Sequence, residues 1–376
     1  MTIRILCTGD FQLGKSFSTL GESAKIFREQ LMTTFTEVID NHGKEHDLIL
    51  IAGDLFDRAA TPTALIEEVA DKLANCSTPC VVLPGNHDAV NTGIPKVLLQ
   101  ALASRKADHV YVPIERTPLV LDELGVTLYP APLMRRDDLS DQYGWIPKRE
   151  ESDGVRIALM HGALSSMPNG QIPEDLAKQK DLDLVICGDQ HGPKQSVEES
   201  NLFNLDISKQ RKLYYGMAPE AMTIVQNFIG SYLRLEVDPR GKIVAHERMD
   251  VGQLRFHNVV FNFDEESTDV LEAFLSLIED HIEETTSVRV TLKGKLIIDK
   301  IKELREKLHD AIQNFRLFEV VDELVVLDDD DEPSDFSDTD PVVRAVKEAL
   351  ESEHGINDDL KHRAIELLRL NMGRWA

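Results

Sequence analysis

The sequence contains no long hydrophobic run and no segment that resembles a signal peptide. No apolar stretch among its 376 residues approaches the ~20 that a helix needs to cross a bilayer. The first residues, Met1 to Arg4, lead directly into a predicted strand and lack the long apolar segment of a secretory signal. We therefore expect a cytoplasmic protein that has no association with membranes.

Cysteine is scarce, which excludes two further classes of protein. The four cysteines are Cys7, Cys76, Cys80 and Cys187, and their spacing does not match a zinc-binding pattern. Four thiols in a chain of this length do not form a disulfide framework either. Because Cys7 and Cys187 fall in predicted strands, we expect reduced thiols that are buried or partly buried.

Basic residues are also in deficit. Lys and Arg total 41 against 66 Asp and Glu, which gives a net charge of -25. A protein that binds nucleic acid by itself usually carries a basic excess or a basic stripe. The balance therefore argues against an autonomous, tight DNA-binding protein. A local positive surface, bound metal ions or a partner protein could still neutralise phosphates.

One short apolar run that ends in a carboxylate organises the rest of the sequence. Leu48–Ile51 predicts a buried central strand of a mostly parallel sheet, Gly53 permits a sharp turn, and Asp54 follows. Ligands of open α/β sheets bind at the carboxyl ends of the strands. Other apolar runs end in the same way, and the polar residues that follow them are Asp10, Asn86 with His87, His161, and Asp189 with His191. We expect five strand ends to bring these groups to one edge of one sheet.

Residues 1–245 consist of alternating strand and helix patterns and form the first predicted domain. Apolar periodicity predicts helices over Glu22–Asn41, Thr63–Asn75 and Ile94–Ser104. Residues 130–152 lack periodicity and predict a surface loop. The alternation over Ser231–Val237, followed by a strand from Lys242, predicts a hairpin.

The pattern changes near Val251, and we place a small second domain at residues 246–327. Its predicted order is strand Leu254–Phe263, helix Thr268–Glu284, strand Ser287–Leu292, helix Ile298–Asn314 and strand Arg316–Leu327. Residues 328–340 are an acidic linker, because repulsion between like charges opposes packing. Residues 341–376 contain two short amphipathic helices that either fold back on the body or dock on a partner.

The residue types at the strand ends suit a pair of divalent cations. Two such ions ~3.5–4 Å apart can clamp the oxygens of an in-line phosphoryl displacement. Asp54 is the candidate for the bridging carboxylate, since each of its oxygens can serve one ion. Asn86, His161 and His191 would fill other positions, and His87 would donate a proton to the leaving group.

A competing pattern lies within the same segment. Gly9–Ser16 matches the P-loop motif G-x-x-x-x-G-K-[ST] and follows a predicted strand. Asp10, however, would place a negative charge where such a loop holds phosphate. The P-loop hypothesis also leaves the polar groups after the other strands without a role. We expect Lys15 to lie on the rim of the metal cleft instead.

Taken together, these motifs resemble those of the calcineurin-like metallophosphoesterases. The resemblance is carried by Gly53-Asp54, Gly85-Asn86-His87-Asp88, His161 after a strand, and the turn from Gly188 to His191. Within that superfamily, residues 1–245 look like the SbcD-type nuclease subunits that work with SMC-like ATPases. The resemblance implies a four-layer α/β metallophosphoesterase sandwich with a small α/β capping domain and C-terminal helices.

The resemblance also implies two sets of metal ligands. Asp10, Gln12, Asp54 and His191 would hold one ion, and Asp54, Asn86, His161 and Asp189 the other. Gln12 and Asp189 depart from the family pattern, which has histidine at both positions. Oxygen-richer sites would favour Mn²⁺ or Mg²⁺ over Zn²⁺. Alternatively the site has decayed and the chain is a scaffold; we favour retained activity.

The function expected from the resemblance is a two-metal DNA phosphodiesterase, an exo- or endonuclease in DNA repair or processing. Its partner would be an SMC-like ATPase of the SbcC type that binds residues 341–376. A homodimer is an expectation that rests on the family alone. The alternative is a stand-alone phosphatase or phosphodiesterase of small nucleotides or other phosphate esters, which the acidic composition favours.

Overall fold

The computed structural model describes residues 2–18, 20, 24–150, 153–167, 170–192, 212–223, 226, 228–263, 286–297, 301, 304, 306 and 317–327. The chain divides into two compact units. The first comprises Met1–Asn258, Ile282–Arg289 and Phe315–Phe318, and the second comprises Val259–His281, Val290–Asn314 and Glu319–Ala376. The boundary that we expected between residues 245 and 246 stays a prediction.

A six-stranded sheet with the order β11-β10-β1-β2-β3-β4 lies in the first unit. Its strands are β1 (Ile3–Thr8), β2 (Leu48–Ile51), β3 (Cys80–Val82), β4 (Val110–Tyr111), β10 (Ser231–Val237) and β11 (Ile243–Asp250). Strand β2 pairs in parallel with β1 and β3 on its two sides, as its apolar run predicts. Strands β10 and β11 form the predicted antiparallel hairpin.

A five-stranded sheet with the order β5-β6-β7-β8-β9 lies against the first. Its strands are β5 (Leu119–Leu121), β6 (Val126–Pro130), β7 (Val155–His161), β8 (Leu184–Gly188) and β9 (Leu213–Tyr215). Strands β6 to β9 run parallel to one another, and β5 is antiparallel to β6.

Three longer helices belong to the first unit. Helices α2 (Thr63–Asn75) and α3 (Ile94–Ser104) have the predicted bounds. Helix α1 covers Ala24–Glu37, and a π-helical turn, Val38–His42, continues it. Within the described residues of this unit, the other α-helix is α4, the short segment Leu176–Gln179. Within the described part of the chain, no helix is long and apolar enough to span a membrane.

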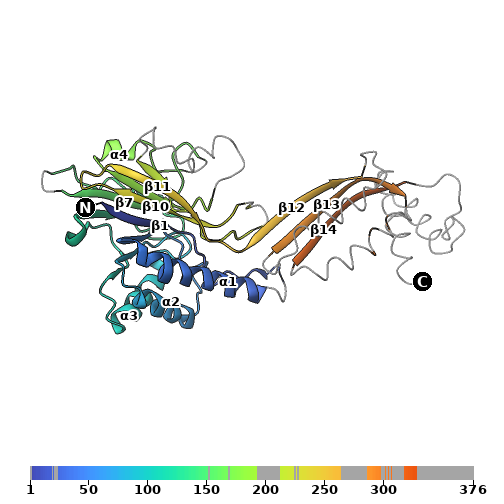
Figure 1. Ribbon diagram of the computed structural model, residues 1–376, viewed down its shortest axis with the longest axis horizontal. Coiled ribbons are helices and arrows are strands. Elements are labelled where there is room, and N and C mark those ends of the chain that lie inside the picture. The colour runs from blue at the N-terminus through green and yellow to red at the C-terminus, as the bar shows by residue number, and fades with distance from the viewer. Residues whose placement is uncertain are drawn as a thin grey trace, which may run out of the picture. The chain divides into compact units, whose positions relative to one another are not determined.

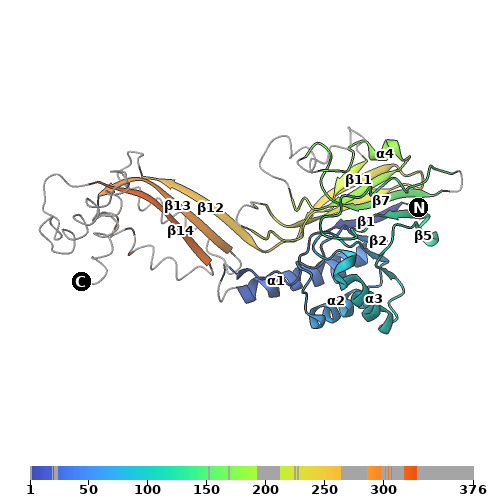
Figure 2. The same ribbon diagram turned by 180° about the vertical axis from the view of Figure 1, so that it is seen from behind.

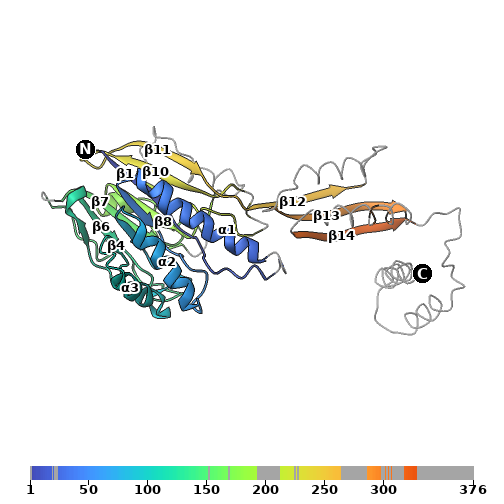
Figure 3. The same ribbon diagram turned by 60° about the horizontal axis from the view of Figure 1, so that its bottom comes forward.

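Among the described residues, the alternation of side chains along the strands produces three hydrophobic cores. Leu6, Ile49 and Ile51 pack against the helices, whereas Ile5, Leu48 and Leu50 pack between the two sheets. The outer face of the five-stranded sheet contacts the segment that contains α4. Figures 1 and 2 show α1, α2 and α3 on one side of the strands and α4 on the other, and Figure 3 shows the three helices side by side. The predicted four-layer sandwich is confirmed, with a thin fourth layer.

One prediction about the sheets was wrong. The five strand ends that carry polar groups do not belong to one sheet: β1, β2 and β3 lie in the six-stranded sheet, and β7 and β8 in the five-stranded sheet. The reason is that an apolar run reports a buried strand but not its pairing partner. The carboxyl ends of strands from both sheets nevertheless meet at the same edge of the sandwich. This is shown by the ligand atoms of Asp10, Asp54 and His161, which lie close together.

A separate three-stranded sheet contains β12 (Arg255–Asn262), β13 (Thr286–Ile297) and β14 (Leu317–Leu327) in that order. These strands occur where the sequence predicts them, and β13 is longer than expected. The predicted helix Thr268–Glu284, the linker 328–340 and the helical segment 341–376 lie outside the described residues. So does the helix Ile298–Asn314, apart from Ile301, Leu304 and Glu306. All four cysteines are free and buried, as expected.

Candidate metal centre

The centre is built from residues that follow strands of both sheets. Asp10 follows β1, Asp54 follows β2, and His161 is the last residue of β7. One ligand atom from each of these three lies within 4.8 Å of those from the other two. Two glycines permit this approach: a Cβ atom would stand 2.1 Å from His161 Nδ1 at Gly53 and 2.2 Å from Asp54 Oδ1 at Gly85. The strands can therefore converge only with glycine at these two positions.

The backbone is unusual at four of the predicted ligands. Asp10, Gln12, Asp54 and Asp189 have φ angles of 52°, 47°, 53° and 90°. They are four of the seven non-glycine residues with positive φ in the described ranges. Side chains disfavour this left-handed region, and such strain concentrates at functional sites. The clustering supports a functional role for this edge of the sandwich.

His161 directs its Nε2 atom at the centre. Its Nδ1 atom lies 2.8 Å from the Ala52 carbonyl oxygen, which can only accept, so Nδ1 carries the proton. The neutral ring therefore has its lone pair on Nε2, which lies 2.8 Å from Asn86 Oδ1 and 3.5 Å from Asp54 Oδ2. A proton donated to a backbone carbonyl is the usual arrangement of a metal-binding histidine.

Asn86 completes a group of acceptors that face one another. Its Oδ1 atom lies 3.0 Å from Asp54 Oδ2, 3.3 Å from Asp54 Oδ1 and 2.8 Å from His161 Nε2, which is an acceptor in the neutral ring. If the Asn86 amide were rotated, Nδ2 would donate hydrogen bonds to these atoms. With the amide as it stands, a bound cation would attract all of the facing oxygen and nitrogen atoms. An amide oxygen, a carboxylate and an imidazole lone pair are ligands that a divalent cation accepts. These three side chains fit a metal ion.

The charges around this group also favour a cation. Burial raises the pKa of Asp10 well above its ordinary value, and the neighbouring Asp54 and Asp189 carboxylates raise it further. Burial alone would lower the pKa of His161, but the carboxylates of Asp54, Asp10 and Asp189 outweigh it and raise the value to about 9. Without a metal, a proton on His161 balances part of the negative charge. A metal ion would replace that proton.

His191 is held differently. Gln226 Oε1 accepts a hydrogen bond from the Met222 N–H at 2.6 Å, so its Nε2 faces His191 Nδ1, at 2.9 Å. An amide nitrogen can only donate, so His191 Nδ1 accepts and the neutral ring carries its proton on Nε2. Burial lowers the pKa of His191 to about 4, which keeps the ring neutral at neutral pH. As it stands, this ring does not offer a lone pair to the centre.

Gln12 and Asp189 occupy the positions where the resemblance implies histidine. Gln12 Nε2 lies 3.5 Å from both Asp54 Oδ2 and His191 Nε2, and its Oε1 atom lies 3.5 Å from Lys15 Nζ. The Asp189 N–H donates to Asp10 Oδ2 at 3.0 Å, and Asp189 Oδ1 is 4.0 Å from His161 Nε2. Both side chains thus lie among the other predicted ligands.

His87 and Asp88 connect the loops after β2 and β3. His87 Nδ1 donates to the Asp57 carbonyl oxygen, which leaves Nε2 at 3.9 Å from Asp54 Oδ2. Asp88 accepts from the Gly85 N–H at 2.8 Å and from the Phe56 N–H at 3.1 Å. Burial and the nearby Asp54 raise the pKa of Asp88 to about 6. Asp88 therefore fixes the two loops relative to each other.

The structure argues against the P-loop hypothesis. A P-loop opens a helix at its Lys-Ser pair, whereas here Lys15 and Ser16 lie outside any helix. Lys15 Nζ pairs with Asp57 Oδ1 at 3.2 Å, and the Lys15 side chain is 23% exposed, as a residue on a rim would be.

The structure places all eight predicted site residues around this centre, and their individual roles stay predictions. Three further groups were missed: the carbonyls of Ala52 and Asp57, and the Gln226 side chain. No motif marks Gln226, which is 35 residues from His191 in the sequence.

A known protein family matches the part of the chain that contains this centre. The family model described as calcineurin-like phosphoesterase matches residues 3–193, which include every predicted site residue. No curated protein matches the chain. Among solved structures, TT1561 of Thermus thermophilus is 13% identical, with a TM-score of 0.40, over 67% of this chain and 100% of its own. A second solved structure is 10% identical, with a TM-score of 0.38 and the same coverage. Likenesses this distant carry no argument about function.

Proposed function

The chain belongs to the calcineurin-like phosphoesterase family of metal-dependent hydrolases, and we propose that it cleaves phosphodiester bonds in DNA. The observation that carries the proposal is the group of facing acceptors formed by Asp54, Asn86 and His161. These atoms lie at the carboxyl ends of parallel strands, where α/β proteins bind ligands.

In this proposal the centre holds two divalent cations, which supply the positive charge that an in-line displacement at phosphorus requires. Asp54 would supply a ligand to both positions. Asn86, His161 and Asp189 complete one side, and Asp10, Gln12 and His191 the other. Because most of these ligands are oxygen atoms, Mn²⁺ is the preferred ion, followed by Mg²⁺.

His87 is the proposed proton donor. The hydrogen bond from Nδ1 to the Asp57 carbonyl fixes the ring, and Nε2 of the doubly protonated ring is then the atom that can transfer a proton to the leaving oxygen. Asp54 accepts from the His87 backbone N–H at 2.9 Å, so the same carboxylate orients the donor. The His87 side chain is 26% exposed, so a substrate can reach its ring.

The proposed partner is an SMC-like ATPase that binds residues 341–376, and a homodimer is a further proposal. Both rest on the resemblance of the sequence to SbcD-type nuclease subunits. The two amphipathic helix patterns in residues 341–376 are the sequence feature that supports docking.

The test is cleavage of linear single- and double-stranded DNA with Mn²⁺, with Mg²⁺ and with chelator. We expect Mn²⁺-dependent cleavage that Asn86→Ala abolishes without loss of folding. Wild-type protein that cleaves neither DNA nor a simple phosphodiester with any metal would contradict the proposal.

A second candidate is a stand-alone phosphodiesterase of small nucleotides. The net charge of -25 favours it, because a polyanion such as DNA is repelled over long range. Removing the residues after Asp335 separates the candidates. A stand-alone enzyme keeps its turnover on small esters and on DNA, whereas a subunit that needs residues 341–376 loses its stimulation by the ATPase.

A further inference from the structure

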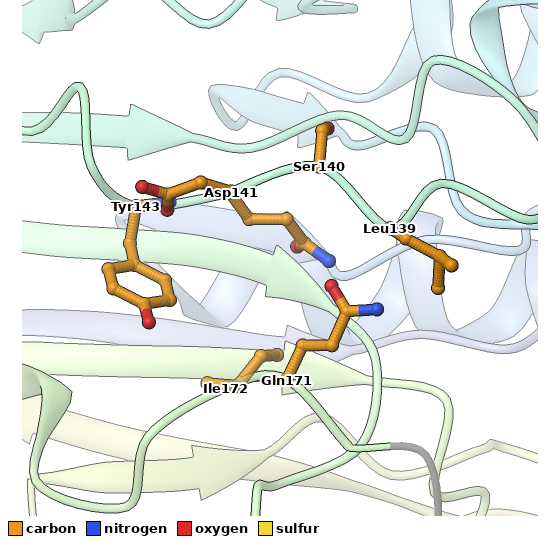
Figure 4. A pocket seen from close by; sticks show the side chains of 7 residues that line it. Leu139, Ser140, Asp141, Tyr143, Gln171 and Ile172 are labelled. Atoms are coloured by element: carbon orange, nitrogen blue, oxygen red, sulfur yellow. The ribbon is translucent and has the colours of Figure 1, made fainter.

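A pocket of about 340 Å³ lies in the first unit between two segments of the five-stranded sheet's outer layer. It is lined by Leu139, Ser140, Asp141, Gln142, Tyr143, Gln171 and Ile172. Figure 4 shows Ser140 and Asp141 on one side and Gln171 and Ile172 on the opposite side. This volume is within the range of pockets that bind small molecules.

The pocket adjoins the metal centre through Gly162, the residue after His161. A Cβ atom at Gly162 would stand 3.6 Å from Ile172 Cδ1 and 3.7 Å from Gln142 Nε2. Two of the side chains that line the pocket therefore reach the backbone next to a predicted metal ligand. The pocket therefore lies beside the end of the strand that carries His161.

Gln142 has a buried acceptor that lacks a partner. The residue is 5% exposed, and its Oε1 atom makes no hydrogen bond within the described part of the chain. Its backbone carbonyl, in contrast, accepts from Trp145 Nε1 at 2.9 Å. An unsatisfied buried acceptor costs about 1–3 kcal/mol, and such groups call for an explanation. A donor on a ligand would satisfy it once the amide turns towards the pocket.

The chemistry of the lining excludes a phosphate as the occupant. None of the residues that line the pocket is Lys or Arg. Its one charged group, Asp141, is an anion, and Asp141 Oδ1 already accepts from the N–H groups of Tyr143 and Gly144. The lining instead offers two amides, a hydroxyl and apolar surface from Leu139 and Ile172. Each amide presents a donor beside an acceptor, which is the pattern on the edge of a nucleobase.

We propose that this pocket binds a nucleobase of the substrate, adjacent to the phosphodiester group at the metal centre. Gln142 and Gln171 hydrogen-bond to the edge of the base, and the exposed Leu139 side chain covers one of its faces. The inference rests on the proposed function, since it assigns the substrate class as nucleotides rather than simple phosphate esters.

The test compares diesters that share a leaving group. Thymidine and deoxyadenosine 5′-(p-nitrophenyl phosphate) carry a base, and methyl p-nitrophenyl phosphate does not. For each protein the readout is the ratio of kcat/KM on the nucleotide to kcat/KM on the methyl ester, with Mn²⁺ present. We expect this ratio to fall about tenfold in Gln142→Met and in Gln171→Ala, as the loss of one hydrogen bond implies.

Gln100→Ala is the matched control, because Gln100 is an exposed glutamine on α3. It should leave the ratio unchanged. Gln171 is only partly buried, so its variant keeps the test valid if Gln142→Met does not fold. A ratio that stays constant in both folded pocket variants would overturn the proposal.

Failure of the proposed function gives a different result. In that case wild-type protein hydrolyses neither class of ester, and the pocket is tested by saturation-transfer NMR with thymidine and deoxyadenosine. Nucleoside signals that Gln171→Ala weakens and Gln100→Ala preserves support the pocket. No signal from either nucleoside with wild-type protein overturns it.

Discussion

His161 and His191 lie on the two sides of the candidate metal centre, and their ring nitrogens have opposite partners. Nδ1 of His161 lies 2.8 Å from a carbonyl oxygen, whereas Nδ1 of His191 lies 2.9 Å from an amide nitrogen. In the neutral rings, the first contact leaves a lone pair on Nε2 and the second leaves a proton there. The surroundings raise the pKa of His161 to about 9 and lower that of His191 to about 4.

The difference shows that residue type alone does not make a ligand. Both histidines lie at or just beyond the ends of strands of the same sheet, and both fit the family motif equally well in the sequence. The hydrogen-bond partner of Nδ1 decides whether Nε2 of the neutral ring has a lone pair that can bind a metal. We therefore expect one strong metal position, formed by Asp54, Asn86 and His161, and one weaker position beside His191.

Removing the carboxylate that the two sides share should have the largest effect. Asp54→Asn keeps the shape of the side chain but removes the charge between the two positions. We expect phosphodiester hydrolysis with Mn²⁺ to fall on the order of 10³-fold, since bound metals contribute several kcal/mol to such reactions. The measurement is turnover of methyl p-nitrophenyl phosphate, with the thermal midpoint as the control for folding. Turnover within tenfold of wild type would remove Asp54 from the centre.

Replacing each histidine in turn tests the asymmetry directly. His161→Gln should weaken the tighter Mn²⁺ site on the order of 10²-fold, because it removes the ring nitrogen whose proton a metal ion would replace. His191→Gln should change the affinity of that site less than about threefold. Calorimetric titration with Mn²⁺ reports both values, and equal losses in the two variants would contradict the asymmetry.

Replacing the hydrogen-bond donor beside His191 Nδ1 by an acceptor should reduce the difference in metal affinity between the two positions. In Gln226→Glu one carboxylate oxygen still accepts from the Met222 N–H, and the other can accept a proton from His191 Nδ1. The lone pair then moves to Nε2, and the affinity of the weaker Mn²⁺ site should rise about tenfold.

Gln100→Glu supplies the control, because it adds the same charge at an exposed position on α3. The same calorimetric titration applies. If both variants strengthen metal binding equally, the effect is one of net charge and the tautomer of His191 has no part in it.

A third histidine, His46, shows whether the contact with a carbonyl oxygen or the nearby carboxylates raise the pKa of His161. Its replacement has the smallest expected effect. His46 Nδ1 lies 2.7 Å from the His42 carbonyl oxygen, as Nδ1 of His161 does from that of Ala52. Burial nevertheless lowers the pKa of His46 from 6.5, and Arg234 and Arg4 lower it further. Because the folded pKa is depressed, the stability that this group confers is present above pH 6.5 and is lost as pH falls below that value. The slope should reach at most about 1.4 kcal/mol per pH unit.

Urea unfolding with chelator at pH 7.5, 6.5 and 5.5 measures this slope. His46→Gln should unfold with a shallower pH dependence than wild type below pH 6.5, and the difference between the two proteins isolates the contribution of His46. Identical slopes would show that His46 takes up protons equally in the folded and unfolded chains.

Much of the fold was predictable, because apolar runs and periodicity report burial directly. The bounds of α2 and α3 and the polar groups after β1, β2, β3, β7 and β8 followed from the sequence. The division of these strands between two sheets did not, since pairing depends on contacts distant in the chain. The contact between Gln226 and His191 could not be predicted either, because it depends on the Met222 N–H, which orients the Gln226 amide.

The left-handed backbone at Asp10, Gln12, Asp54 and Asp189 has an evolutionary consequence. Glycine adopts positive φ without a steric penalty, so a glycine at any of these positions would relieve strain while removing a ligand. Selection for thermal stability and selection for chemistry therefore act in opposite directions at the same four codons. A laboratory lineage evolved for heat resistance alone should fix glycine there early, and it would lose the centre while gaining stability.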